Sequence, residues 1–280
     1  MAGSIKTKEE IALLRAGGKR LGKILREIVS LARPGISAAE LDARAERLIF
    51  DSGGAPSFKG HTGKKDVRSY PAATCISIND EIVHAPPLPD KILRPGDVVG
   101  IDIGMWWPRA ARTINRQPTT NNSAKKPLCT DTAITVGVGK ISKDAERLLK
   151  VTQEALGIGI AEVRPGATTG DIGYAIEGFL KHHGLGIVRN FAGHGVGYAV
   201  HEEPLIPNFG KRGEGAVLRK GMVIALEPMT TLGGEDLILG DDGWTYKTKD
   251  KSLSAHFEHT IAVTHNGAEV LTAAYEADAE

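Results

Sequence analysis

The sequence is short of several features that mark particular classes of protein. It has two cysteines, Cys75 and Cys129, among 280 residues, which excludes a framework of several disulfides and is typical of a reducing compartment. It has no apolar run near the roughly 18 residues that a transmembrane helix needs. Its first residues, MAGSIKTKEE, lack the apolar core of a signal peptide. We therefore expect a cytoplasmic protein with no membrane partner.

The chain also lacks an excess of charge of either sign. It has 35 basic against 34 acidic residues, which gives a formal net charge of +1. A global field that attracts nucleic acid or an anionic membrane is therefore excluded, although these numbers still allow a local basic patch. With 41% hydrophobic residues, the chain can bury a full core as one large domain or two small ones.

The sequence does contain an internal repeat. Residues 93–102 read LRPGDVVGID and residues 218–227 read LRKGMVIALE, so each apolar run ends on an acid after a shared glycine. Residues 31–49 match residues 162–180 in the same way. The repeat predicts one domain over 1–280, built from related halves at about 1–136 and 137–280. We expect an α+β fold with an antiparallel inner sheet covered by helices on its outer face.

Local patterns predict the elements of each half. Apolar residues at helical spacing run through 9–32 and 143–163, and a Pro-Gly pair stops each run. The next segments, 37–54 and 168–186, open on a capping Ser or Thr and close on glycine, which predicts a second helix in each half. Short Val- and Ile-rich stretches such as GDVVGIDIG and GMVIALEP predict buried strands.

Four carboxylates stand out because of where the repeat puts them. Asp102 and Glu227 end predicted apolar strands, and Asp131 and Glu258 begin the strands that follow. Pseudo-twofold symmetry brings them together on one sheet, where Cβ atoms on paired strands lie about 5 Å apart. Four such carboxylates cannot all be ionised unless cations neutralise them. Pairing with Arg or Lys is the alternative, but these strands contain neither, so the pattern predicts a metal site.

Three histidines are candidates for the site. Although a lone histidine is more often structural, His194 lies between glycines, which let the backbone come close to a neighbour and leave the imidazole bare, and it is the candidate ligand. His84 and His201 occupy matching places in the two halves, so we interpret them as substrate contacts. One nitrogen with several bridging oxygens favours Mn(II), Fe(II) or Co(II) over a Cys-rich zinc site. Sites of this type hold two ions that share a nucleophile.

Over nearly its whole length the chain resembles the type I methionine aminopeptidases, whose pita-bread fold is shared with prolidase-type peptidases. The matching phrases include YPAATCISINDEIVHAPP, AGHGVGYAVHEEP, GMVIALEPM and SLSAHFEHTIAVT. The resemblance implies an aminopeptidase that removes the initiator methionine from nascent polypeptide N-termini with a small second residue. It also implies two divalent metal ions as cofactors, with Co, Mn, Fe and Zn as the candidates.

The resemblance also assigns roles position by position. It implies five metal ligands: Asp102, Asp131, His194, Glu227 and Glu258. Glu227 would also be the general base, His84 would contact the scissile amide and His201 would stabilise the oxyanion. The implied methionine pocket is an apolar set with a thiol, which suits a thioether: Phe58, Tyr70, Cys75, Val200 and Trp244.

Two insertions depart from the family pattern. The shorter covers 59–69, and the longer, at about 105–128, separates Asp102 from Asp131 and predicts an extended hairpin. The tip of this hairpin carries five cations and no acid: Arg109, Arg112, Arg116, Lys125 and Lys126. Two interpretations of the tip stay open. It is either a solvated hairpin tip or a surface, 109–126, for transient electrostatic contact with the ribosome.

Two other functions fit part of the pattern. An Xaa-Pro peptidase of the same fold usually has an additional N-terminal domain, whereas few residues precede the first helix predicted here. A catalytically inactive binding module of this fold typically loses metal ligands, and all five residues are present. The pattern therefore favours a metallo-aminopeptidase, which we expect to be a monomer.

Overall fold

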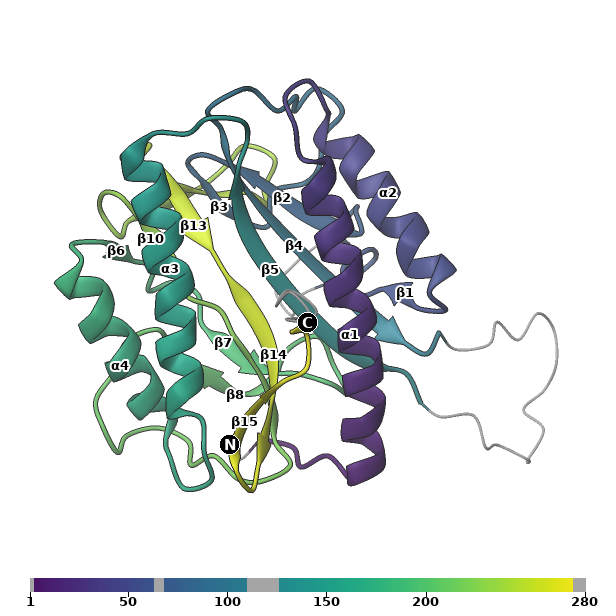
Figure 1. The fold of residues 1–280 in the computed structure, drawn as a ribbon, viewed down its shortest axis with the longest axis vertical. Helices are drawn as coiled ribbons and strands as arrows, with labels where there is room; N and C mark the ends of the chain where they lie inside the picture. Colours follow the sequence, from purple (N-terminus) through teal and green to yellow (C-terminus); the bar gives the residue numbers. More distant parts are fainter. Residues whose placement is uncertain (1–2, 63–67, 110–125, 274–280) are drawn as a thin grey trace, which may run out of the picture.

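The structure, a computed structural model, describes residues 3–62, 68–109 and 126–273. Helices cover one face of a twisted antiparallel sheet, with one pair over each half of it (Figure 1). The helices are α1 (Lys8–Leu31), α2 (Ala38–Asp51), α3 (Lys143–Glu162) and α4 (Thr169–His182). Among the described residues, none of the helices combines the length and the apolar character needed to cross a bilayer.

The main sheet runs across both halves of the chain in the order β1-β4-β5-β14-β9-β7-β8, with β2 added beside β4 and β15 beside β14. Its strands are β1 (Ala55–Pro56), β2 (Thr74–Ile78), β4 (Val98–Trp107), β5 (Leu128–Gly137), β7 (Gly193–Gly195), β8 (Glu202–Ile206), β9 (Val223–Leu226), β14 (Glu258–Thr264) and β15 (Gly267–Val270). Two small sheets flank it, with strands β3 (Glu81–Val83), β6 (Gly186–Ile187), β10 (Met229–Thr231), β11 (Leu237–Leu239), β12 (Tyr246–Thr248) and β13 (Ser254–His256).

The predicted helix starts at α2 and α4 are confirmed, with matching caps. At α2, Ser37 Oγ accepts the N–H of Glu40, and the Glu40 carboxylate accepts the N–H of Ser37. Thr168 and Asp171 make the same reciprocal pair at α4. Each capping box satisfies two N–H groups that a helix start would otherwise leave unpaired. The two halves therefore begin their second helix by the same local chemistry.

The repeated glycines, Gly96 and Gly221, also form equivalent turns in the two halves. Gly96 has φ +95° and donates its N–H to the carbonyl of Val138 over 2.8 Å. Gly221 has φ +89° and donates to Val263 over 2.9 Å. A left-handed backbone at both turns favours glycine. These turns lead into β4, which contains Asp102, and into β9, which Glu227 directly follows.

The core lies between the helices and the sheet. Ile101 and Ile103 of β4 are fully buried there, as are Ile224 of β9 and Ile261 of β14, and they pack with side chains of the helices. Because side chains alternate along a strand, residues next to these isoleucines point to the opposite face of the sheet. That face carries the candidate site.

The inserted segment changes where two of the acids lie on their strands. We predicted that Asp102 ends a strand and that Asp131 begins one, and both predictions are wrong. Strand β4 continues past Asp102 to Trp107, which pairs with Leu128 at the start of β5. The insertion lengthens this hairpin, so both acids lie within paired strands. Residues 110–125, which carry most of the predicted basic tip, lie outside the described residues.

Candidate active site

The strand register gathers three acids around one small residue. Asp102 of β4 and Glu258 of β14 both pair with Ala133 of β5, from opposite sides. Asp131 lies two residues before Ala133 on the same strand. Paired residues of antiparallel strands point to the same face, and so do residues two apart. The three carboxylates therefore share the face away from the helices, and the alanine leaves room between them.

A second row of paired residues adds an imidazole and the fourth acid. His194 of β7 and Thr260 of β14 both pair with Ala225 of β9, and Glu227 follows two residues after that alanine. Strand β7 comes very close to β9 here. A Cβ added at Gly193 would lie only 2.4 Å from the Ala225 carbonyl oxygen. Glycine is therefore required beside His194, which agrees with the predicted close backbone approach.

The donor atoms lie at distances that suit a shared metal ion. His194 Nε2 is 3.7 Å from Asp131 Oδ2 and 3.6 Å from Glu227 Oε1. One donor atom each of Asp131, His194 and Glu258 all lie within 4.8 Å of one another. Two ligands that each bind an ion at about 2.1 Å lie roughly 3 to 4 Å apart. The spacing of these side chains therefore fits metal coordination.

Hydrogen bonds orient two of the candidate ligands. His194 Nδ1 lies 2.9 Å from the carbonyl of Gly195. Because a carbonyl can accept but not donate, Nδ1 carries the proton and Nε2 presents a lone pair to Asp131 and Glu227. Thr260 Oγ1 accepts the N–H of Asp131 over 3.0 Å and lies 3.0 Å from its Oδ1. The threonine thereby fixes the Asp131 carboxylate.

The carboxylates lie in an environment that disfavours their charge. Burial raises the pKa of Asp102 to about 7 and that of Glu227 to about 8, and repulsion from neighbouring carboxylates adds to both shifts. Burial also raises the pKa values of Asp131 and Glu258. Asp102 Oδ1 is buried and has no hydrogen-bond partner among the described residues. Divalent cations would neutralise the charge of these carboxylates and coordinate the unpaired Asp102 oxygen, so the donor set fits a metal centre.

A cavity of about 430 Å³ opens onto the cluster, and His84 and His201 line it together with the five candidate ligands. His84 has φ +59°, an uncommon conformation for a residue with a Cβ, and its ring meets the edges of Phe191 and Tyr246. Strained backbone of this kind clusters at functional sites. The contacts with Phe191 and Tyr246 hold the His84 imidazole at the cavity wall.

The His201 ring lies 4.5 Å from the ring of His194, measured between centroids. The His201 side chain lines the cavity. Loss of contact with bulk water, together with the neighbouring His194 and His61, lowers the pKa of His201 well below the usual range. His201 is therefore neutral near pH 7 and can donate an N–H hydrogen bond without carrying charge.

Comparison with known proteins agrees with this site. The model of metallopeptidase family M24 matches residues 12–117 and 123–265. The chain belongs to family M24. A methionine aminopeptidase from Clostridium perfringens is 40% identical over 96% of this chain and 98% of its own length. One from Aquifex aeolicus is 40% identical over 97% of this chain and 99% of its own. The predicted resemblance to type I methionine aminopeptidases is therefore confirmed.

Solved structures show the same relationship. A methionine aminopeptidase from Thermotoga maritima superimposes with a TM-score of 0.85 at 37% identity, covering 96% of this chain and 99% of its own. A prolidase from Pyrococcus horikoshii has a TM-score of 0.71 at 23% identity, covering 96% of this chain and 63% of its own, and shows the fold alone. Both agree with the predicted pita-bread fold, which the M24 chain has.

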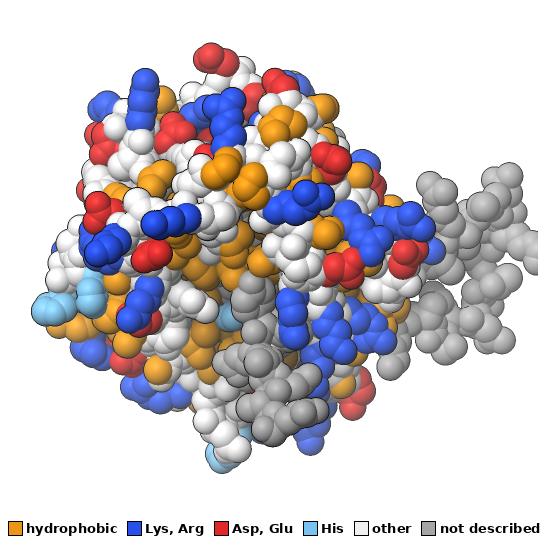
Figure 2. All heavy atoms as spheres, turned by 45° about the horizontal axis from the view of Figure 1, so that its top comes forward, with side chains coloured by type: hydrophobic (Ala, Val, Ile, Leu, Met, Phe, Trp, Pro, Cys, Tyr) orange, Lys and Arg blue, Asp and Glu red, His pale blue; other side chains and the backbone are white. Residues whose placement is uncertain are grey.

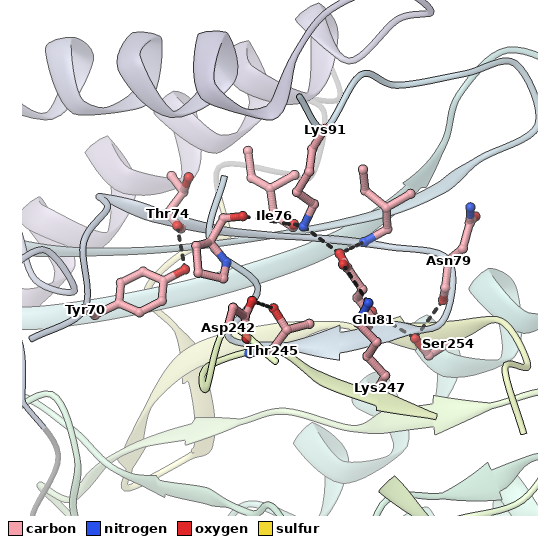
Figure 3. Close-up of polar contacts among 12 residues, drawn as sticks. Tyr70, Thr74, Ile76, Asn79, Glu81, Lys91, Asp242, Thr245, Lys247 and Ser254 are labelled. Atoms are coloured by element: carbon pink, nitrogen blue, oxygen red, sulfur yellow. Dashed lines mark hydrogen bonds and ion pairs between the residues drawn. The ribbon is translucent and has the colours of Figure 1, made fainter. Parts of the chain in front are cut away.

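Four of the five predicted pocket residues line the cavity of the M24 chain: Phe58, Tyr70, Cys75 and Trp244. Tyr70 and Trp244 meet edge to face with centroids 5.4 Å apart. Asp242 holds the turn before the tryptophan by accepting the N–H of Trp244 over 2.8 Å and a hydrogen bond from the Thr245 hydroxyl. Figure 3 shows that bond beside the one from the Tyr70 hydroxyl to the carbonyl of Thr74.

The same close-up shows how β3 is fixed behind the pocket. Glu81 pairs with Lys91 over 2.6 Å and with Lys247 over 3.7 Å (Figure 3). Lys247 lies on β12, the strand that pairs with β3. Because β12 follows Trp244 and β3 precedes His84, these ion pairs join the pocket wall to a candidate catalytic residue.

Val200 is the predicted pocket residue that the structure puts elsewhere. It is 2% exposed and packs in a separate cluster with Leu13 and Leu14 of α1. It is not among the described residues that line the cavity. The Val200 side chain is buried in this cluster, so we leave Val200 out of the proposed pocket.

The sequence analysis missed several residues that line the cavity, chiefly His61, Phe191, Tyr246 and His256. His256 is the nearest to the acids, with Nε2 3.5 Å from Glu227 Oε2. This Nε2 is buried without a hydrogen-bond partner in the described parts of the chain. His256 precedes Glu258 by two positions, but the two residues lie on different strands, β13 and β14, so alternation along one strand does not relate them.

Proposed function

We propose that the chain, a metal-dependent methionine aminopeptidase, removes the initiator methionine from nascent proteins whose second residue is small. The observation that carries the proposal is one cavity of about 430 Å³ that is lined both by the five candidate metal ligands and by the apolar residues of the candidate pocket. The relatives at 40% identity over nearly the full length support the same activity.

The metal centre in this proposal consists of two divalent ions, drawn from Co, Mn, Fe and Zn. The ligands would be Asp102, Asp131, His194, Glu227 and Glu258, whose oxygens outnumber the single nitrogen. When bound, the ions would acidify a water molecule and polarise the scissile carbonyl. The raised carboxylate pKa values support the proposal, because cations remove the cause of the repulsion.

The protein side chains then divide the remaining work. Glu227 takes a proton from the attacking water and passes it to the leaving amine, as a general base and then a general acid. His201, which is neutral, donates an N–H to the oxyanion of the tetrahedral state. His84 contacts the scissile amide and orients it. The cavity that these residues share supports this division, because one substrate can reach all three.

The apolar part of the cavity sets the substrate. Tyr70 and Cys75 are 6% and 4% exposed, and with Phe58 and Trp244 they offer a thioether an apolar surface and a polarisable sulfur. The candidate ligands lie beside this pocket and would bind the free α-amine. We therefore propose that methionine fills the pocket and that the space beyond the scissile bond admits a small residue.

Peptide hydrolysis by the metal-free protein tests the proposal. Turnover of Met-Ala-Ser should appear when Mn(II), Fe(II), Co(II) or Zn(II) is added back, and Ala-Pro peptides should remain intact. Preferential cleavage of Ala-Pro peptides would instead support the Xaa-Pro peptidase. An absence of hydrolysis with every metal would support the inactive binding module.

The natural substrates imply where the enzyme works. Since nascent chains emerge from ribosomes, we propose that it acts in the cytoplasm, as a monomer, and that 109–126 makes transient contact with the ribosome. Acidic and basic side chains are both spread over the face seen in Figure 2. At the base of 109–126, Arg109 donates its backbone N–H to Gly53 over 2.7 Å, and its guanidinium lies 5.4 Å from the Phe50 ring centre.

Shortening 109–126 to a turn separates the two interpretations of the basic tip. Tripeptide turnover should remain unchanged in either case. If the segment docks on phosphates, the shortened protein should co-sediment less with ribosomes and show a shallower salt dependence. Equal co-sedimentation from about 50 to 200 mM salt would leave a solvated hairpin tip.

A further inference from the structure

A buried lysine lies close to the candidate catalytic residue His201. The Lys6 side chain has no exposed surface, and its Nζ lies 2.8 Å from Glu202 Oε2. Nζ also lies 4.6 Å from the centre of the Tyr198 ring and donates to the hydroxyl of Ser4. Lysine is rarely buried in this way unless its charge is paired, because removing it from water costs several kcal/mol. The pair with Glu202 therefore accounts for its place.

The surroundings of Lys6 are shaped to receive it. Its backbone N–H donates to the carbonyl of Gly221 over 2.8 Å, which fixes the segment before α1 to the turn that enters β9. Its side chain runs past Gly197, where an added Cβ would lie 2.7 Å from Lys6 Cε. Gly197 also has φ +134°, a backbone conformation that residues with a side chain rarely adopt. The Lys6 side chain is therefore enclosed by its neighbours.

Glu202 connects Lys6 to the loop that carries His201. One carboxylate oxygen faces Lys6, and the other accepts the N–H groups of Tyr198 and Ala199 over 2.5 and 3.2 Å. The carboxylate therefore closes the loop 198–202 on itself, and the ammonium group holds the carboxylate. Such charge-assisted hydrogen bonds are stronger than neutral ones.

His201 lies inside this closed loop. Glu202 follows it in the chain, and Val200, which precedes it, is buried in an apolar cluster that includes Leu13 and Leu14 of α1. The residues on both sides of His201 are therefore held by the N-terminal part of the chain. The His201 ring itself meets the His194 ring edge to face. An oxyanion contact depends on such fixed geometry, because a donor must be in place before charge develops.

We propose that Lys6, acting through Glu202, is a positioning residue that fixes His201 over the metal-ligand cluster. The segment before α1 is then part of the catalytic apparatus. This inference rests on the proposed function, which gives His201 the contact to the oxyanion. No role in binding metal or methionine is assigned to Lys6.

Replacing the lysine by an uncharged side chain of similar length tests the inference. Lys6→Met should lower kcat for Met-Ala-Ser by about ten- to a hundredfold, which is part of what losing an oxyanion donor costs. KM and Mn(II) affinity should change by less than about threefold, because substrate and metal ligands are untouched. Lys8, which is exposed on the first turn of α1, supplies the matched control, and Lys8→Met should retain wild-type kcat.

A double-mutant cycle separates positioning from a general loss of structure. If Lys6 acts through His201, then Lys6→Met should lower kcat by less than about twofold in a His201→Ala background. Equal effects in both backgrounds would refute the inference, and so would wild-type kcat for Lys6→Met alone. Should Lys6→Met fail to fold, Glu202→Gln takes its place in the cycle, since it removes the charge that Lys6 holds and keeps an acceptor for the loop.

The wild-type protein distinguishes this inference from the function on which it rests. Absence of tripeptide turnover by wild type with every added metal would refute the proposed function. Wild-type turnover combined with additive effects of Lys6→Met and His201→Ala would refute the positioning role alone.

Discussion

Binding of a divalent metal to the metal-free protein should release protons near neutral pH. The perturbation is the addition of Mn(II) or Co(II), and the protons come from carboxyl groups that burial keeps protonated. The pKa of Asp102 is raised to about 7 and that of Glu227 to about 8. Metal ligands must be deprotonated, so any proton held by these groups has to leave.

The expected number follows from these two values. At pH 7 the two groups, with pKa values of about 7 and about 8, hold most of their protons, so together they should release about one to two protons. Glu258 and Asp131, whose pKa values are also raised, add to that number. At pH 9 Asp102 and Glu227 hold few protons, so their share of the release should nearly disappear.

Titration calorimetry measures this release directly. The observed enthalpy of Mn(II) binding is compared between buffers with small and large ionisation enthalpies, and the slope gives the number of protons. A release of one or more at pH 7 that declines toward pH 9 is expected. No release at pH 7, or the same release at both pH values, would refute the reasoning that burial holds these carboxyls neutral.

The same groups determine how stability depends on pH. Their pKa values in the folded protein lie above those of unfolded Asp and Glu, at about 3.9 and 4.3. The stability they contribute is therefore complete below about pH 4 and is lost as pH rises through about 7 to 8. Thermal unfolding should show the metal-free protein losing stability over this range, and bound metal should restore it.

Three substitutions test the roles assigned to single side chains. Glu227→Gln keeps the shape of the side chain but removes its charge, so kcat for Met-Ala-Ser should fall by about a hundredfold or more, and near wild-type turnover would contradict the assignment. His201→Ala should lower kcat more than it raises KM, whereas an effect confined to KM would argue against an oxyanion contact. Trp244→Ala should raise KM for Met-Ala-Ser and leave Mn(II) affinity unchanged, and a loss of metal binding would contradict its place in the methionine pocket.

The features that the sequence predicted well depend on local information. A capping box needs residues three positions apart, so Ser37 and Thr168 could be identified directly. The acids could be found because the chain repeats its strand pattern, and Glu258 does begin its strand. In both cases the information lies within a short stretch of sequence: the capping residues are three positions apart, and the strand pattern occurs twice.

The features that it missed depend on long-range packing. Lys6 and Glu202 are 196 positions apart, and nothing around either residue indicates the other. The strand bounds near Asp102 and Asp131 were misplaced because the repeated pattern locates the acids but not how far each strand continues into the inserted hairpin. Val200 was assigned to the pocket by resemblance, but it is buried in the apolar cluster with Leu13 and Leu14 and is not among the described residues that line the cavity.

The position of the site follows from how the two halves join. Strand β5 of the first half pairs with β14 of the second, and Glu258 lies opposite Ala133 at that seam. Each half therefore brings two acids to the line along which the halves meet. Duplication alone would make the two sides equivalent, but His194 adds a nitrogen donor beside Asp131 and Glu227. The imidazole breaks the symmetry of the four carboxylates, so two ions held between the halves would have unequal ligand sets.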